Sequence, residues 1–396
     1  MKDIYERLLA AASLRSTDGA VRIVSEYEPL AGVGTPLFPP TVKAKETNSA
    51  GYLVEPRYVH GDETRVVLLD QPQSQANRCE TALLDAVRRR EVFIPYLEMV
   101  TESYGMPVRM TSLEAPHRSR DAYFRDSVDE SGRKFDETEL GAALRDASSG
   151  DLSAYLRLVP SDLAYGVWDS HRKRRIQVKI PRAYRSEMIG IKPLIGVRAA
   201  GRVDRLNLAG DTVELTDSGW SPSALEKPKK GVKTARMSEL GHGMIPPSEG
   251  LGGVSVTSVQ RSASLSLAQL ATLRFGNASE DLTAAARALI ASIALLGDRL
   301  AFSAPALHLR SGCDLLMVSE RIEWVQRGRD GDPHLEPLDL ATPQGALELF
   351  TIAVDRAREA GLQWASEPVV VRPNTSLQQA IDKSYLIAGV GAAESE

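Results

Sequence analysis

Cysteine is scarce in this chain, since only Cys79 and Cys313 occur among 396 residues, far apart and outside any C-x-x-C pair. This spacing excludes a zinc finger and a disulfide framework, so we expect a protein of the reducing cytoplasm. Long apolar runs are also missing: the most apolar segment, residues 288–296, is about half a bilayer span. The charged N-terminal stretch lacks the apolar region of a secretory signal, and we expect no membrane association.

An excess of charge of one sign is absent as well. The chain has 48 Lys and Arg against 52 Asp and Glu, with a net charge of −4. The composition as a whole therefore gives no argument for nucleic-acid binding, and such an argument has to come from local clusters.

Sequence motifs of common enzymes are missing too. The sequence has no H-x-x-x-H, no Walker A motif and no D-x-D within a predicted strand, and the turn GVGTP at 32–36 lacks the Lys of a phosphate loop. His171 and Asp169 are close enough in sequence to form an acid–base pair. With no partner set, we favour contact of His171 with a phosphate or a base, or turn capping, over catalysis. We expect no enzymatic activity, no metal and no cofactor.

The periodicity of apolar residues predicts an α+β fold. Strands are expected at RVVLLD, FIPYLEMV, SDLAYGVWD, RIQVKI, IGVRAAGRVDRL, 313–325 and 367–371, and helices at 73–90, 136–147, about 280–302 with Ser279 as N-cap, and 343–360. We interpret the whole as a ferredoxin-like (RRM-like) core assembled from both ends of the chain, with large finger and thumb insertions.

The predicted organisation has five parts. They are an N-terminal helix with loops and weak strands at 1–64, the first part of the palm at 65–116, a finger-like helical insertion at 117–160, a basic strand-rich region at 161–275 with a mobile, thumb-like arm at 217–250, and a C-terminal α/β part at 276–396 that completes the palm.

Positive charge gathers in two places. The stretch HRKRRIQVKIPRAYR, 171–185, carries seven Lys or Arg and no acid, and KPKKGVKTAR, 227–236, carries five in a Gly- and Pro-containing context. In RIQVKI the alternation places Arg175 and Lys179 on one face of a strand and the apolar residues on the other. Two acid-free clusters favour a phosphodiester backbone as partner over a merely solvated surface. Arg118, Arg120 and Arg125 extend this surface or form ordinary salt bridges with Asp121 and Asp126.

The start of the helix at 73–90 is unusually polar. Gln71, Ser74, Gln75 and Arg78 share one side by three- and four-residue spacing, while the stripe Ala76, Cys79, Leu83 and Val87 is predicted to be buried. A helix N-terminus offers unpaired N–H groups, so this set suits an RNA phosphate. The alternative is a locally satisfied helix start for which Asp70 supplies the cap.

Several motifs occur in an order that resembles one family. They are SQANR at 74–78, GVWDSH at 166–171, KIPRAYRSE at 179–187, GGVSV at 252–256 and RSASLSLAQLATLRF at 261–275. Together they are similar to the backbone RAMP subunit of type I-U (I-G) CRISPR effector complexes, a branch of the Cas-seven superfamily. The resemblance implies a hand-shaped protein that polymerises along a CRISPR RNA and presents the guide to target DNA, without nuclease activity. Its partners would be the CRISPR RNA, target DNA through the guide, copies of itself and the other effector subunits.

Carried over by position, the resemblance assigns Gln75, Asn77 and Arg78 to a guide-binding helix start and Arg175, Lys179, Arg182 and Arg185 to a basic palm. Charge clustering adds His171, Arg172, Lys173, Arg174, Lys229, Lys230 and Lys233, and Arg261 opens the last motif. Two other functions stay open. One is a metal-dependent endoribonuclease on the same core, and the other is a cytoplasmic enzyme that binds an anionic metabolite in the 171–185 region.

Overall fold

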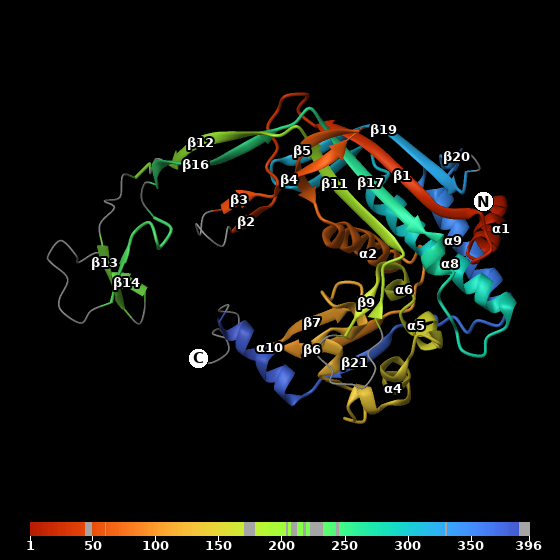
Figure 1. Ribbon diagram of the computed structural model, residues 1–396. Coiled ribbons are helices and arrows are strands. Elements are labelled where there is room, and N and C mark those ends of the chain that lie inside the picture. The colour runs from red at the N-terminus through yellow and green to blue at the C-terminus, as the bar shows by residue number, and fades with distance from the viewer. Residues whose placement is uncertain are drawn as a thin grey trace.

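The computed structural model describes residues 1–43, 50–59, 61–169, 179–202, 205–206, 212–216, 219–221, 233–242, 245–328 and 331–387. Figure 1 shows a body of sheet and helices from which a narrow arm projects. None of the helices in these ranges is long and apolar enough to cross a membrane.

An eight-stranded antiparallel sheet forms the main layer of the body. Its order is β18-β19-β1-β17-β11-β5-β4, with β20 paired to β19. The strands are β1 Asp18–Pro29, β4 Val54–Val59, β5 Asp62–Asp70, β11 Tyr184–Ile191, β17 Ser258–Ser266, β18 Ala306–Arg310, β19 Cys313–Gln326 and β20 His334–Pro337. Figure 1 shows the sheet curling over α2 and α8. The fold is therefore a mixed one, as the sequence predicted.

Helix α8 lies at the centre of the body. It spans Glu280–Phe302, and the hydroxyl of its N-cap Ser279 accepts a hydrogen bond from the N–H of Leu282, which confirms the predicted cap. Its residues are buried almost all round because the sheet covers one side and helices cover the others. The helices packed on it include α1 Lys2–Ala11, α2 Pro72–Arg88, α6 Ser161–Tyr165, α7 Leu267–Leu270 and α9 Pro343–Glu359.

A second, smaller sheet has the order β7-β6-β21-β8, in which β21 pairs parallel to β6. Its strands are β6 Leu97–Ser103, β7 Met106–Thr111, β8 Ser127–Val128 and β21 Val369–Pro373, and α10, Thr375–Ile387, packs on it. The chain between β7 and β11 also forms several short elements, of which β9 and β10 pair antiparallel. They are η1 Arg118–Arg120, α3 Ala122–Arg125, η2 Phe135–Glu137, α4 Glu139–Asp146, α5 Ser153–Leu158, β9 Val167–Trp168 and β10 Lys179–Ile180.

The arm is a two-stranded antiparallel ribbon of β12, Leu194–Arg202, and β16, Ile245–Ser255. Beyond it lies a small sheet of β13 Thr212–Thr216, β14 Gly219–Ser221 and β15 Thr234–Arg236 (Figure 1). A separate hairpin pairs β2, Thr41–Lys43, with β3, Ala50–Tyr52. The predicted arm at 217–250 thus coincides with part of this projection, and 222–232 lies outside the described residues.

Two predictions of secondary structure were wrong, and a third had a shifted start. The region 1–64 was expected to hold weak strands, but β1 has 12 residues and lies in the main sheet between β17 and β19. SDLAYGVWD was expected to be one strand, but it forms helix α6 and only then the two residues of β9, because so short an apolar run does not separate a buried helix from a strand. The strand expected at 93–100 begins at Leu97.

Candidate nucleic-acid interface

Helix α2 begins without a side-chain cap. Gln71 occupies the N-cap position with extended backbone, its side chain makes no capping hydrogen bond, and Pro72 follows in the first turn. Asp70 was one candidate for the cap. Its carboxylate instead accepts hydrogen bonds from Gln75 Nε2 at 2.6 Å and from Arg78 Nε at 2.8 Å. Some of the polar side chains at the start of α2 therefore form hydrogen bonds within the protein.

Two predicted RNA-binding residues, Gln75 and Arg261, are fully buried. Gln75 Oε1 accepts from Ser186 Oγ at 2.7 Å and from Arg261 Nε at 3.2 Å. The Arg261 guanidinium pairs with Asp298 and lies 3.9 Å from the ring centroid of Phe302. Neither side chain reaches the surface, so assigning them to RNA contact was wrong.

Arg78 and Asn77 differ in their surroundings. The Arg78 guanidinium donates to the carbonyl oxygens of His308 at 3.3 Å and Leu309 at 2.8 Å, besides its bond to Asp70, and it thereby ties α2 to β18. Its side chain is 28% exposed. Asn77 is exposed on α2 and stays a candidate contact.

The other predicted residues are dispersed. Seven of them lie outside the described residues: His171, Arg172, Lys173, Arg174, Arg175, Lys229 and Lys230. Lys233 is exposed in the arm directly before β15. Arg185 is exposed on β11, with its guanidinium 3.6 Å from the Glu187 carboxylate. Lys179 and Arg182 are the predicted residues that the structure brings together with the start of α2.

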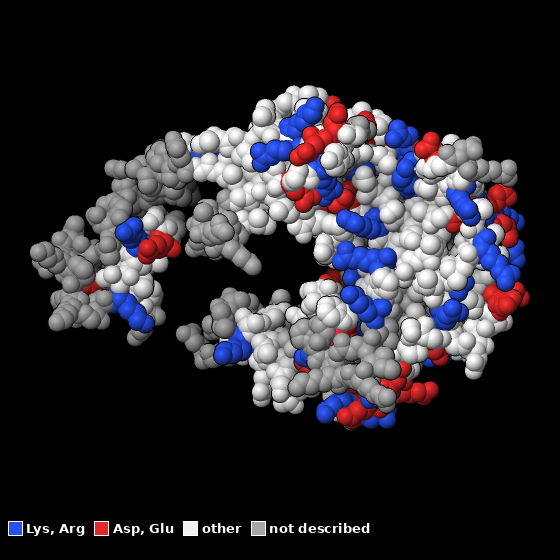
Figure 2. Space-filling view, viewed as in Figure 1, with Lys and Arg blue, Asp and Glu red and all other residues white. Residues whose placement is uncertain are grey.

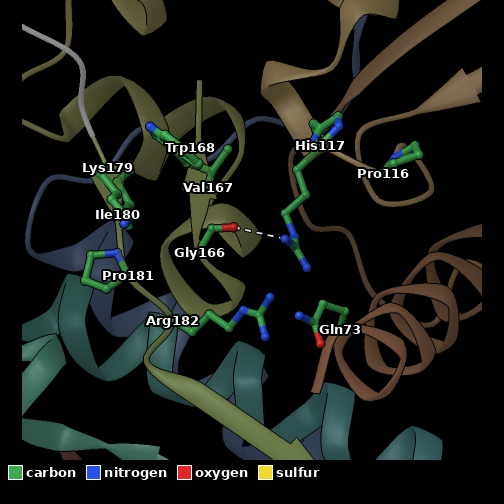
Figure 3. Close-up of a pocket in the computed structure, with 11 residues that line it drawn as sticks. Gln73, Pro116, His117, Gly166, Val167, Trp168, Lys179, Ile180, Pro181 and Arg182 are labelled. Atoms are coloured by element: carbon green, nitrogen blue, oxygen red, sulfur yellow. Dashed lines mark hydrogen bonds between the residues drawn. The ribbon is translucent and has the colours of Figure 1, made fainter. Parts of the chain in front are cut away.

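They meet in a pocket of about 510 Å³. Four segments line this pocket. They are Gln73 from α2; Pro116, His117 and Arg118 around the start of η1; Gly166, Val167 and Trp168 at β9; and Lys179, Ile180, Pro181 and Arg182 in and after β10. In Figure 3 the Arg182 guanidinium and the Gln73 amide point toward one another, with Lys179 and Trp168 along another side. Two stretches far apart in sequence, both singled out for phosphate, thus form one pocket.

The two arginines of the pocket are close enough to affect each other. Burial and the charge of Arg118 lower the pKa of the Arg182 guanidinium from its ordinary value. Arginine remains protonated under all ordinary conditions, so the pocket holds two positive charges that repel each other. Within the described part of the chain, no group accepts a hydrogen bond from the Arg182 guanidinium.

Arg118 is held rigidly at the back of the pocket. Its Nε and Nη2 donate to the two carboxylate oxygens of Glu80 at 2.6 and 2.7 Å, and its Nη1 donates to the carbonyl oxygen of Gly166 at 3.0 Å (Figure 3). Glu80 is 2% exposed, and burial raises the pKa of its carboxyl while Arg118 opposes that rise. Arg118 has a φ of +53°, a conformation that non-glycine residues rarely adopt. Such strain persists only where the surroundings fix the residue, as this bidentate pair does.

Gly166 is required at the turn into β9. Its φ is +81°, and a Cβ placed there would lie 3.0 Å from both the backbone nitrogen of Arg182 and the carbonyl oxygen of Ile180. The turn therefore packs directly against the segment that follows β10 and carries Arg182. This close approach fixes the position of the Arg182 backbone in the pocket wall.

Trp168 is an exposed aromatic residue beside this charge. It is 53% exposed, and the Lys179 ammonium lies 5.2 Å from the centroid of its ring. Tryptophan is enriched at interfaces, and aromatic rings combined with cations are common where proteins bind single-stranded nucleic acid. Figure 2 shows Lys and Arg side chains on the inner wall of the hollow between the body and the arm.

Sequence reasoning missed Gln73, His117 and Trp168 as site residues and treated Arg118 only as a possible surface contact. One signal was present: Trp168 stands next to an acid-free basic run, within a motif that had been quoted. The proximity of Arg118 to Arg182 depends on the fold and had no signal in the sequence. Among the described residues no group of three or more His, Cys, Asp and Glu is placed to hold a metal ion.

Comparison with known families bears on the same part of the chain. Residues 21–193 match a family of CRISPR-associated proteins. The family is described as CRISPR-associated protein GSU0053, and the matched stretch holds every residue that lines the pocket but covers less than half of the chain. No curated protein matches the sequence. The family match supports a CRISPR-associated role.

Proposed function

We propose that this chain is a non-catalytic, CRISPR RNA-binding backbone subunit that polymerises along the guide and presents it to target DNA within an effector complex of type I-U (I-G). The observation that carries the proposal is the pocket in which Arg118, Lys179 and Arg182 meet Gln73 of the α2 start. It lies within the stretch that matches a CRISPR-associated family. A cytoplasmic location belongs to the same proposal.

The topology of the main sheet supports an RRM-like palm. Four adjacent strands have the order β19-β1-β17-β11, helix α2 precedes β11 in the chain, and α8 connects β17 to β19. Both helices pack against each other. A ferredoxin-like βαββαβ unit has this strand order, with its two helices on one face. The finger-like and arm segments are then insertions between these elements.

The arm supports association with further copies. Leu194 and Val197 of β12 are 76% and 78% exposed, on a two-stranded ribbon that has no core of its own. Isolated ribbons are marginally stable in water, and neighbouring exposed apolar side chains mark interaction surfaces. A neighbouring subunit on the same guide would cover them.

Coexpression of the chain with a CRISPR array tests the proposal. The purified protein should carry small RNA of uniform length, and its affinity for single-stranded RNA should fall with salt with a log–log slope of about 0.7 per neutralised phosphate. Replacing both Lys179 and Arg182 by Ala should lower the slope by roughly 1 to 1.5 on the same basis. Arg358→Ala, at an exposed site on α9, is the matched control and should leave it unchanged.

Two results would contradict the proposal. One is recovery of nucleic-acid-free monomers at low salt from cells that produce the guide. The other is site-specific cleavage of a matched RNA by the purified chain with Mg²⁺ or Mn²⁺, since this would favour an endoribonuclease.

A further inference from the structure

We propose that the pocket is a subsite for one nucleotide of single-stranded RNA, whose phosphate lies between Arg118 and Arg182 and whose base stacks on the indole of Trp168. The inference rests on the proposed function and adds the chemistry of recognition: one pocket binds both the backbone and a base. A plain basic groove would bind the backbone alone.

The donors of the two arginines argue for a phosphate. A guanidinium has five N–H donors, and Arg118 uses three of them on Glu80 and Gly166. Two are left for a ligand. The Arg182 guanidinium has no acceptor among the residues that the structure describes, although it is half-buried. A phosphate between the two would accept from both and remove their mutual repulsion.

The start of α2 adds donors at the same place. Gln73 lines the pocket from the first turn of a 17-residue helix, and no side chain caps that turn. The amide of Gln73 is a further donor toward the Arg182 side of the pocket (Figure 3). A helix N-terminus favours an anion, and here it is joined by two guanidinium groups.

The carboxylate within reach does not cancel this preference. Glu80 holds Arg118 in a bidentate pair and is buried behind it, so the Glu80 oxygens are engaged by the arginine. The buried Asp162 also acts on Arg118, but burial raises the pKa of its carboxyl to about 7. Two carboxyl groups against Arg118, Arg182 and Lys179 leave the pocket positive. Because Arg118 is locked, the position of the phosphate is set before the RNA binds.

Trp168 and Lys179 provide the place for the base. The indole is 53% exposed at the edge of the pocket, and its sequence neighbour Val167 is in the wall. A volume of about 510 Å³ is in the range that accommodates a small ligand. A base can lie flat on an indole only when it is unstacked and unpaired, so the subsite selects single-stranded RNA over duplex.

The test uses the full chain, freed of RNA, and two oligonucleotides of equal length: oligoadenylate and a fully abasic ribose-phosphate backbone. Trp168→Ala should weaken binding of oligoadenylate roughly tenfold and leave binding of the abasic strand unchanged, since stacking is lost only where a base exists. Arg182→Gln should weaken both strands and lower the salt slope by about 0.7. Tyr58→Ala, at a 79% exposed aromatic residue of β4, is the control for Trp168 and should change neither strand.

Three outcomes overturn the inference alone. If Trp168→Ala lowers the affinity for both strands equally, Trp168 has a structural role. If it lowers the affinity for neither strand, no base stacks on Trp168. An unchanged salt slope in Arg182→Gln would remove the phosphate from this pocket. In each of these cases the proposed function survives if the wild-type chain still binds RNA. Failure of the wild-type chain to bind either strand overturns the inference and the proposed function together. Thermal unfolding of each variant shows whether it is folded.

Discussion

Arg261 of β17 and Asp298 of α8 form an ion pair in which both side chains are fully buried. Tyr184 of β11 donates its hydroxyl to the same carboxylate, and Arg299 pairs with Asp298 and with Glu320 of β19. The pair therefore joins α8 to three strands of the main sheet. Burial acts to raise the pKa of Asp298, but the charges of Arg261 and Arg299 outweigh it and bring the pKa to about 2.

Removing the charge of Asp298 should destabilise the protein strongly. Asp298→Asn leaves Arg261 buried without its counterion, and we expect a loss of about 3–5 kcal/mol in the free energy of unfolding. Urea unfolding followed by circular dichroism measures it. Asp355→Asn on the exposed side of α9 is the matched control, with a change of about 0.5 kcal/mol or less. Equal midpoints for the two variants would show that the pair contributes little.

Asp162 should make stability depend on pH. It is fully buried in α6, its Oδ2 accepts from Ser119 Oγ, and burial raises its pKa to about 7. The unfolded chain loses this proton near pH 3.9, so the folded state binds more protons between about pH 4 and 7, and its stability falls as pH rises through that window.

Replacement of Asp162 by Asn should remove this contribution. We expect Asp162→Asn to unfold at higher urea concentration than the wild type at about pH 8, while the difference shrinks or reverses at about pH 5. The measurement is the pair of urea midpoints at each pH. Parallel pH profiles for the two proteins would mean that Asp162 titrates normally in the folded state.

Gly166 and Gly132 allow backbone strain to be separated from steric conflict. Both have a φ close to +80°, but a Cβ at Gly166 meets the backbone of Arg182 and Ile180, whereas a Cβ at Gly132 meets nothing within 4 Å. Gly132→Ala should cost about 1 kcal/mol from its conformation alone. Gly166→Ala should cost about 2 kcal/mol more because β10 has to move.

The readout for both glycine variants is thermal unfolding together with RNA affinity. RNA binding should weaken only in Gly166→Ala, since that variant displaces the wall that carries Arg182. Identical behaviour of the two variants would show that the pocket tolerates a wider turn.

Arg78 and Asn77 are neighbours on α2 with different expected roles. Arg78→Ala removes a guanidinium that bonds Asp70 and two carbonyl groups of β18, and should lower the free energy of unfolding by about 1–3 kcal/mol. Asn77→Ala should stay within about 0.5 kcal/mol of the wild type. Chemical unfolding of the single variants checks this. A stable Arg78→Ala protein that loses RNA would restore Arg78 as a direct contact.

Helices and strands with a clear period were predictable from the sequence. The helices at 73–90, 136–147 and 343–360 were confirmed within a few residues because each carries an apolar stripe of helical spacing. Strand β1 was undervalued although its buried residues Val21, Ile23 and Tyr27 follow the two-residue period of a strand. Its central place depends on partners far along the chain, which no local pattern contains.

The errors at the site have a similar cause. Arg261 lies on the same face of β17 as the buried residues Val259, Ala263 and Leu265, so the two-residue period of a strand would have directed its side chain inward. Gln75 likewise stands four residues before buried Cys79 on the inner stripe of α2. In both cases the prediction of an RNA contact followed the polar character of the residue and not its position on the buried face of the element. A buried counterion such as Asp298, far away in sequence, is the information that the pattern lacks.

The pairing of β1 also has a consequence for biosynthesis. Its two neighbours, β17 and β19, begin at Ser258 and Cys313, whereas β1 ends at Pro29. At translation rates of about 5–20 residues per second, the completed β1 would wait roughly 10–50 s on the ribosome before its first neighbour is made. During that time a long strand with alternating apolar residues has both edges unpaired. We therefore expect folding of the main sheet to be a late event that depends on chaperones holding the nascent N-terminal part.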